Sequence, residues 1–224
     1  MSRVLAYCGL LHDPGILLPE IGVNRAPVKV LTEGKLSLLW SKVDWPFDPA
    51  SMQRNAVDFH RVVNHIFDQT AVVPFRLLTV FEDERSLMAF VDQHRGGFIA
   101  DLERLKSFVQ MECVVYFVMP RPMVGPNPGE AHVRQSAELW WMVREHVQNA
   151  IDALLDISRD VRVREIKSGN RIFVLVDRGK EDAFGAAVQK VVVPGAIARR
   201  VSGPRPAAEF LSESTKARQI AGVR

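Results

Sequence analysis

Residues 55–85, NAVDFHRVVNHIFDQTAVVPFRLLTVFEDER, are the stretch of this sequence that decides the fold prediction. Apolar side chains at helical spacing predict an amphipathic helix over about residues 49–69, one face of which covers a sheet. A strand over residues 72–80 follows, interrupted by Pro74. Because proline cannot donate a ladder hydrogen bond, this strand belongs at a sheet edge or at a bend. Acidic residues at 82–84 then favour a helix start, so the stretch predicts an α+β fold.

The second half of the chain has its own alternation of elements, after a segment rich in proline and glycine. That segment, residues 121–129, cannot form a regular element, and we place the domain boundary there. Residues 1–120 form the first α+β domain, in which Gly96-Gly97 should separate two helices. Over residues 130–211 the predicted order is helix, strand, strand, helix, strand, which is a ferredoxin-like sandwich that lacks or borrows its first strand. The polar residues 212–224 are expected to be a loose tail.

The composition is that of an ordinary globular protein, and it excludes several classes. Apolar residues make up 47% and charged residues 25% of the 224 residues, which allows a packed core. The net charge of +3 is too small to argue for nucleic-acid binding. No apolar run approaches the roughly 18–20 residues that span a bilayer, so we expect a cytoplasmic protein without membrane insertion. Basic residues become more frequent toward the C-terminus, which indicates either solvated strand faces or a surface for an acidic partner.

No motif for catalysis, phosphate binding or metal coordination stands in the sequence. His60 and His65 lie on one predicted helix, but a spacing of five residues turns them about 140° apart, so they cannot share a metal ion. We interpret His60 as a boundary residue that hydrogen-bonds a neighbouring strand. Cys8 and Cys113 lie in apolar runs and are expected to be buried free thiols. The sequence therefore predicts no enzyme activity, no cofactor and no metal site.

The helix that opens the second domain carries two adjacent tryptophans. Trp140 belongs to an expected inward face of four further apolar residues, Val133, Val147, Ile151 and Leu154. Trp141 lies about 100° away, at the border of that face. Core packing of both rings is the expectation. The alternative is an exposed Trp141 that contacts a partner together with Met142.

Five strings follow one another in a distinctive order. They are residues 4–10, Phe59-His60-Arg61-Val62-Val63, residues 70–81, Met111-Glu112-Cys113-Val114 and Ser202-Gly203-Pro204. In this order they resemble the GvpL/GvpF family of gas vesicle accessory proteins over nearly the whole chain. The positions that carry the family signature are His60, Pro74, Arg76, Gly203 and Pro204.

The resemblance implies a modified ferredoxin-like N-terminal domain, a second α+β domain and a non-enzymatic role. The protein would be a minor gas vesicle protein that helps the small hydrophobic shell protein to assemble. Its partners would be that shell protein and other gas vesicle accessory proteins, and its location the cytoplasm and the gas vesicle. Because unpaired strand edges are natural templates for binding, we expect contacts near Pro74 and in the segment 121–129.

Two positions depart from the family pattern. Leu77-Leu78 stand where the family usually has Phe-Gly, and Arg205-Pro206 follow Pro204 where the family tends to have aromatic residues. Two alternatives stay open for this reason. One is a divergent ferredoxin-like module that binds a ligand or dimerises and is not tied to gas vesicles, and the other is an enzyme that uses His60 or His12. The sequence leaves the oligomeric state open.

Overall fold

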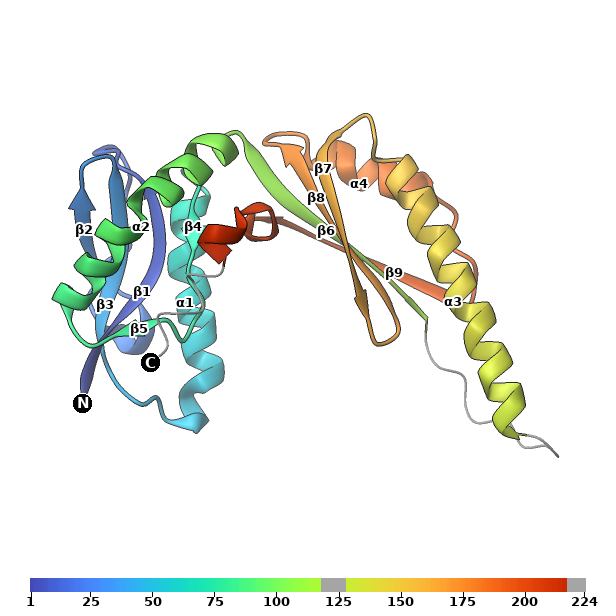
Figure 1. The fold of residues 1–224 in the computed structure, drawn as a ribbon, viewed down its shortest axis with the longest axis horizontal. Helices are drawn as coiled ribbons and strands as arrows, with labels where there is room; N and C mark the ends of the chain where they lie inside the picture. Colours follow the sequence, from blue (N-terminus) through green and yellow to red (C-terminus); the bar gives the residue numbers. More distant parts are fainter. Residues whose placement is uncertain (118–127, 217–224) are drawn as a thin grey trace. The chain divides into compact units, whose positions relative to one another are not determined.

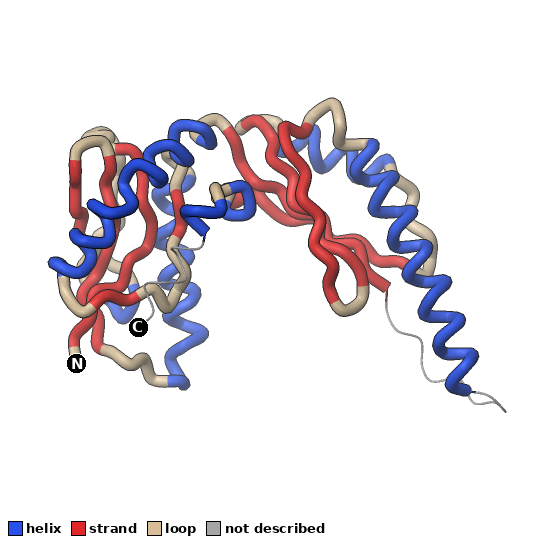
Figure 2. The backbone as a smooth tube through the Cα atoms, viewed as in Figure 1, coloured by secondary structure: helices blue, strands red, loops and turns tan. Residues whose placement is uncertain are grey.

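The computed structural model describes residues 1–117 and 128–216, and the chain divides into two compact units. The first unit holds Met1–Ser107 together with the residues from Arg205 onward, and the second holds Phe108–Pro204. In each unit, helices accompany one sheet (Figures 1 and 2). The predicted α+β class with two ferredoxin-like domains is confirmed, although the two units meet at a different residue from the predicted boundary.

A five-stranded sheet forms the first unit, and its central strand is almost wholly apolar. β1 (Ser2–Leu11) pairs antiparallel with β3 (Leu36–Asp44), which pairs with the edge strand β2 (Lys29–Glu33). On its other side β1 pairs with two short strands, β4 (Val73–Pro74) and β5 (Val80–Phe81). Successive residues of β1 point to opposite faces of the sheet, and because consecutive residues are buried, both faces are covered at this strand.

Two helices belong to this unit, and an aspartate caps either the helix itself or the turn that leads into it. α1 (Met52–Phe67) follows a short turn in which the Asp48 side chain accepts a backbone hydrogen bond at 3.0 Å. α2 (Glu84–Leu105) is capped by Asp83, which accepts a backbone hydrogen bond at 2.8 Å. α2 runs through Gly96-Gly97, where two separate helices were expected. The buried side chains of α1 are Asn55, Phe59, Val62, Val63, Ile66 and Phe67.

The second unit has the strand order of a ferredoxin-like domain. Its elements are β6 (Phe108–Phe117), α3 (Pro128–Asp152), β7 (Ser158–Ile166), β8 (Gly169–Asp177), α4 (Glu181–Lys190) and β9 (Ile197–Arg205). The sheet order is β7-β8-β6-β9, so that the first strand of the unit lies in the middle of its sheet. Strand, helix, strand, strand, helix, strand in this arrangement is the split βαβ pattern.

The second unit begins with β6, at Phe108, and not after the predicted boundary at residues 121–129. The predicted boundary at residues 121–129 places this strand in the first domain and leaves the second domain without a first strand. In the structure β6 is that strand, and it pairs with β8 from Phe108 opposite Asp177 to Tyr116 opposite Gly169. The proline-rich segment therefore falls inside the second unit, between β6 and α3. Its residues up to 127 lie outside the described residues.

The chain after β9 belongs to the first unit, where a buried carboxylate holds it. Asp101 on α2 is 2% exposed and accepts from the amide and the hydroxyl of Ser212, at 3.0 and 2.8 Å. Arg104 pairs with Asp101 at 2.6 Å and also donates to the Phe210 carbonyl at 2.7 Å. The tail predicted to be loose, 212–224, therefore begins with an anchored residue.

The charge of Asp101 makes this anchor depend on pH. Burial alone would raise the pKa of Asp101, but hydrogen bonds from Arg104, Thr215 and Ser212 outweigh it and lower the pKa below its ordinary value. A carboxyl group with a lowered pKa stabilises the fold above its unfolded pKa, about 3.9, and this contribution is lost as the pH falls through the folded value. We expect Asp101→Asn to lower the free energy of unfolding at neutral pH by about 1–3 kcal/mol.

Urea unfolding of the full chain at neutral pH and near pH 3 measures both effects. The matched control is Asp92→Asn, an exposed residue of the same helix. The wild type and the control should lose stability in acid, and Asp101→Asn should lose less, because its anchor is already gone. An Asp101→Asn protein with the stability and pH profile of the control would show that the anchor contributes nothing.

Gly203 lies where β9 passes close to β6. Its φ is +127°, and a Cβ built there would lie 2.8 Å from Met111 Sδ and 3.0 Å from the Gln110 carbonyl oxygen. Gly203→Ala should therefore destabilise the protein by more than about 1 kcal/mol in thermal unfolding. The control is Gly185→Ala on α4, where a Cβ meets no atom within 4 Å. It should instead stabilise its helix by about 0.5–1 kcal/mol, and equal effects of the two changes would contradict the packing argument.

Candidate functional site

His60 lies on the outward side of α1, and not at a boundary with a strand as predicted. Its side chain is exposed, and its ring meets Phe59 edge-on at a centroid distance of 5.9 Å. The outward side of α1 forms a shallow depression lined by Gln53, Ala56, Val57, His60, Arg61, Asn64, His65 and Asp68. Val57 is 54% exposed, so the depression contains a large apolar side chain in contact with water.

A turn between β1 and β2 holds an unusual backbone conformation beside α1. Asn24 and Arg25 have φ values of +56° and +58°, a left-handed region that is uncommon outside glycine. The neighbouring Val23 amide donates to the Tyr7 hydroxyl at 3.0 Å, which ties the turn to the central strand. Tyr7 is fully buried, so the turn has a fixed support that compensates for the strained backbone.

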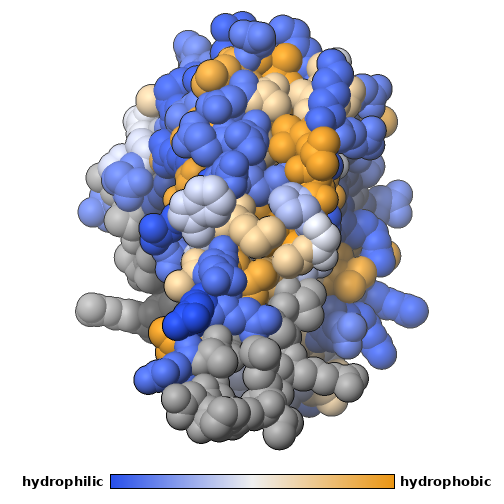
Figure 3. Space-filling view, turned by 90° about the vertical axis from the view of Figure 1, so that its right-hand side faces the viewer, coloured by the Kyte–Doolittle hydropathy of each residue, from blue (hydrophilic) through white to orange (hydrophobic). Residues whose placement is uncertain are grey.

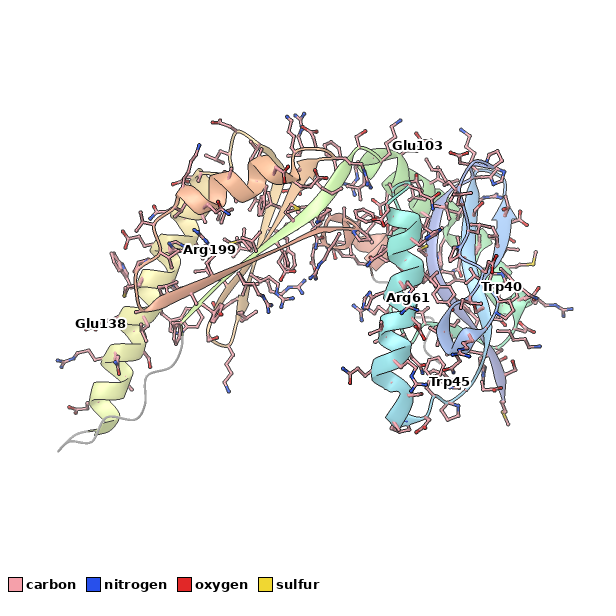
Figure 4. All side chains as sticks on the ribbon, turned by 180° about the vertical axis from the view of Figure 1, so that it is seen from behind. Trp40, Trp45, Arg61, Glu103, Glu138 and Arg199 are labelled. Atoms are coloured by element: carbon pink, nitrogen blue, oxygen red, sulfur yellow. The ribbon has the colours of Figure 1, made fainter. Side chains whose placement is uncertain are left out.

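Three arginines line the hollow between this turn and α1. Arg25 comes from the turn, and Arg54 and Arg61 come from α1. Arg61, labelled on α1 in Figure 4, has a side chain that is 68% exposed. Asp58 lines the same hollow and pairs with Arg61 at 2.7 Å. Three guanidinium groups against one carboxylate leave an excess of positive charge, which suits a carboxylate or phosphate group of a partner.

Pro74 and Arg76 lie in the segment that follows α1, with Pro74 in β4 and Arg76 in the turn after it. Pro74 is half-buried and stands opposite Cys8 of β1, at the sheet edge that its missing donor predicts. Arg76 is exposed, and its carbonyl accepts from the Thr79 amide at 2.9 Å in the turn between β4 and β5. The edge at β4 is only two residues long and offers a short template for an added strand.

Trp141 and Met142 lie in different environments on α3. Trp141 is 65% exposed and Met142 is half-buried, and successive helical residues point about 100° apart. Trp140 is half-buried, and its ring meets Phe117 of β6 edge-on at 5.5 Å. The structure therefore packs Trp140 and exposes Trp141, which is the alternative that the sequence left open. A partner for Trp141 and Met142 stays a prediction.

Several basic residues of the second unit are paired or turned inward. Arg159 pairs with Asp177 at 3.3 Å, and Arg171 pairs with Glu112 at 3.1 Å. Arg199 on β9 is directed toward α3 (Figure 4) and donates to a backbone carbonyl at 2.9 Å. These contacts fit paired and solvated strand faces, the first of the two interpretations of the basic C-terminal half.

Cys8 and Cys113 are buried free thiols, as predicted. Burial raises the pKa of Cys8 to about 12 and that of Cys113 to about 11, so neither is a ready nucleophile. Within residues 1–117 and 128–216, the His, Cys, Asp and Glu side chains form no group that could hold a metal ion. In the same part of the chain no helix is long and apolar enough to cross a membrane.

The sequence analysis missed Arg25, Arg54 and Val57. Val57 gave a usable signal, because an apolar residue between Gln53 and Arg61 at spacings of four lies on the polar side of the helix. In the turn, Asn24 is a residue type that favours the left-handed region, but nothing in the sequence marks Arg25 beside it. The structure thus places His60, a predicted signature residue, beside a surface that the sequence did not reveal.

Comparison with known proteins gives a family for this chain. The profile of the family described as gas vesicle synthesis protein GvpL/GvpF matches residues 4–123, more than half of the 224 residues. No curated protein sequence matches the chain. The GvpF structure from Anabaena sp. PCC7120 has the same fold, with 12% identity, a TM-score of 0.77 and coverage of 95% of this chain and 97% of that chain. GvpF from Microcystis aeruginosa gives 12% identity and a TM-score of 0.71, over 94% of this chain and 99% of that chain.

The matched residues contain all helices and strands of the first unit up to α2, and they also contain β6. This protein belongs to the GvpL/GvpF family of gas vesicle synthesis proteins.

Proposed function

We propose that this protein is a non-enzymatic accessory protein of gas vesicle formation, which works in the cytoplasm and binds the small hydrophobic shell protein. The observation that carries the proposal is the family match over residues 4–123. Because that match covers the first unit, the binding surface is best sought there. In this unit the outward side of α1 joins an exposed apolar side chain to a positively charged hollow.

The outward side of α1 offers both kinds of contact that a hydrophobic partner with a charged rim requires. Val57 supplies apolar area that is still in contact with water in this structure. Arg54 and Arg61 lie three and four residues from it on α1 and line, with Arg25, the neighbouring positively charged hollow, which speeds the encounter with an acidic segment and selects for it. We propose that these four residues contact the shell protein, and that the arginines pair with its acidic side chains.

The two-residue edge at Pro74 is the competing surface. β4 offers fewer backbone groups than the five-residue edge strand β2, and Pro74 itself has no amide hydrogen to donate. Contact through side chains of α1 is therefore favoured over addition of a strand at this edge. The segment 121–129, the other expected contact, lies mostly outside the described residues.

The full chain with Val57→Asp and Arg54→Glu should lose shell-protein binding. Both positions are exposed, so the fold should persist while the apolar contact and one charge pair are removed. Co-purification of tagged protein with the host's shell protein should fall about tenfold or more. Binding by the wild type should also weaken as salt is raised, because exposed charge pairs are screened.

The matched control is Met88→Asp with Lys106→Glu. Met88 on α2 and Lys106 at its C-terminal cap are both exposed, and the charge changes are the same in kind. The control should retain the shell protein as the wild type does. Retention by the α1 variant would place the contact elsewhere on the protein. Failure of the wild type itself to retain the shell protein would contradict the proposed function.

A further inference from the structure

The part of α3 before Leu139 has no buried side chain among those described. The helix packs against its sheet through Leu139, Val143, Val147 and Ala150, which are 0–8% exposed. Before Leu139, Glu130 and residues 133–138 are exposed or half-buried. Figure 1 shows the start of α3 extending past the strands of its sheet. Figure 3 looks onto this side of the molecule and shows apolar atoms lying between hydrophilic ones.

The exposed residues form a stripe at the spacing of a coiled coil. The stripe, called here the α3 seam, consists of positions 130, 133, 134, 137, 140, 141 and 144. At about 100° per residue these positions share an arc of about 120°, turned away from the side that packs on the sheet. Val133 is 69% and Trp141 65% exposed, and Trp140 is half-buried at the margin. A seam with this much exposed apolar surface calls for a partner helix.

The α3 seam is complementary to itself in the antiparallel direction. Suppose that a second copy packs antiparallel, with Ala137 of both copies at the same level. A residue that follows position 137 by a given number of residues then lies level with the partner residue that precedes position 137 by the same number. Trp140 then meets the partner's Arg134, and Trp141 meets the partner's Val133. Apolar contact and an arginine stacked on an indole ring follow, and both are favourable.

The charged residues of the α3 seam also favour antiparallel packing. Seven residues from Ala137 on either side stand Glu130 and Arg144, which have opposite charges. In an antiparallel pair each Arg144 meets the partner's Glu130, and this happens twice by symmetry. In a parallel pair glutamate would face glutamate and arginine would face arginine, which is unfavourable. The small side chain of Ala137 at the symmetry axis lets the two helices approach closely.

We infer that two copies of this chain associate through the α3 seam, antiparallel and centred on Ala137. The partner is a second copy because this chain itself supplies the complement at every level of the seam. The inference concerns the second unit alone and does not depend on the proposed binding of the shell protein by α1.

Engineered cysteines test the register directly. In Ala137→Cys the two new thiols face one another across the axis, so mild oxidation should form a covalent dimer of the full chain. The native Cys8 and Cys113 are buried and should not interfere. The matched control is Glu138→Cys, an exposed residue one position further that points about 100° away from the centre of the seam. It should cross-link far more slowly.

Sedimentation measurements over a range of concentrations give the strength of association. Trp141→Glu places a charge in the seam and should weaken dimerisation about 30-fold or more. Glu130→Arg should weaken it, and Glu130→Arg combined with Arg144→Glu should restore it, because the pair is then exchanged. Circular dichroism confirms that each variant is folded.

A wild type that stays monomeric at high micromolar concentration, with equal cross-linking of the two cysteine variants, would overturn the inference. Capture of a different protein by Ala137→Cys in place of a second copy would overturn it as well. Dimerisation without rescue by the charge exchange would contradict the antiparallel register.

Discussion

The second sheet depends on β6 lying between β8 and β9. β6 brings a continuous apolar run into the centre of the sheet, where Val109, Cys113 and Val115 are fully buried. The neighbouring β9 must then pass close to Gln110 and Met111, and only glycine at position 203 leaves room for their backbone and side chain. Packing between strands thus explains the glycine at position 203, which needs no chemical role.

The C-terminal segment is held in the first unit by a different kind of contact. Phe210 and Leu211 are 1% and 2% exposed, so the segment buries apolar surface, but apolar contacts alone do not fix its position along α2. Asp101 does so, because one carboxylate accepts from Ser212 and Arg104 at defined distances. A buried charge is costly unless it is paired in this way, so loss of either donor should be felt strongly. The segment is therefore specified by polar contacts and stabilised by apolar ones.

Local patterns in the sequence predicted local structure well. They failed where the structure of a segment depends on contacts with residues far away in the sequence. The helix over 49–69 and the edge position of Pro74 follow from spacing and from a missing donor, and both are present in the structure. The partner of β6 is β8, more than fifty residues away, and nothing near β6 reveals it. Gly96-Gly97 predicted a helix end, but Val91 and Phe98 on either side are only 0% and 1% exposed. Their burial keeps α2 continuous.

The candidate surfaces were harder to predict, because a residue of such a surface is recognised only once the residues that form the core are known. His60 looked like a boundary residue on α1, but the sheet is covered by Phe59, Val62 and Val63, which leaves His60 outside. Asp101 is the opposite case, a residue that is buried although exposure is expected. An acidic residue in a helix is usually solvated, and Asp101 is buried only because the C-terminal segment returns to α2.

The heptad pattern of α3 shows how one stripe can serve two purposes. Val133, Trp140, Val147 and Leu154 recur every seven residues and were expected to face inward together. A straight helix has 3.6 residues per turn, so such a stripe rotates by about 20° with each repeat. Val147 is 8% exposed, Trp140 is half-buried and Val133 is 69% exposed, while Leu154, in the turn just after α3, is fully buried. The same repeat that fastens the end of α3 to its sheet therefore turns outward at the start of the helix, where a second helix can use it.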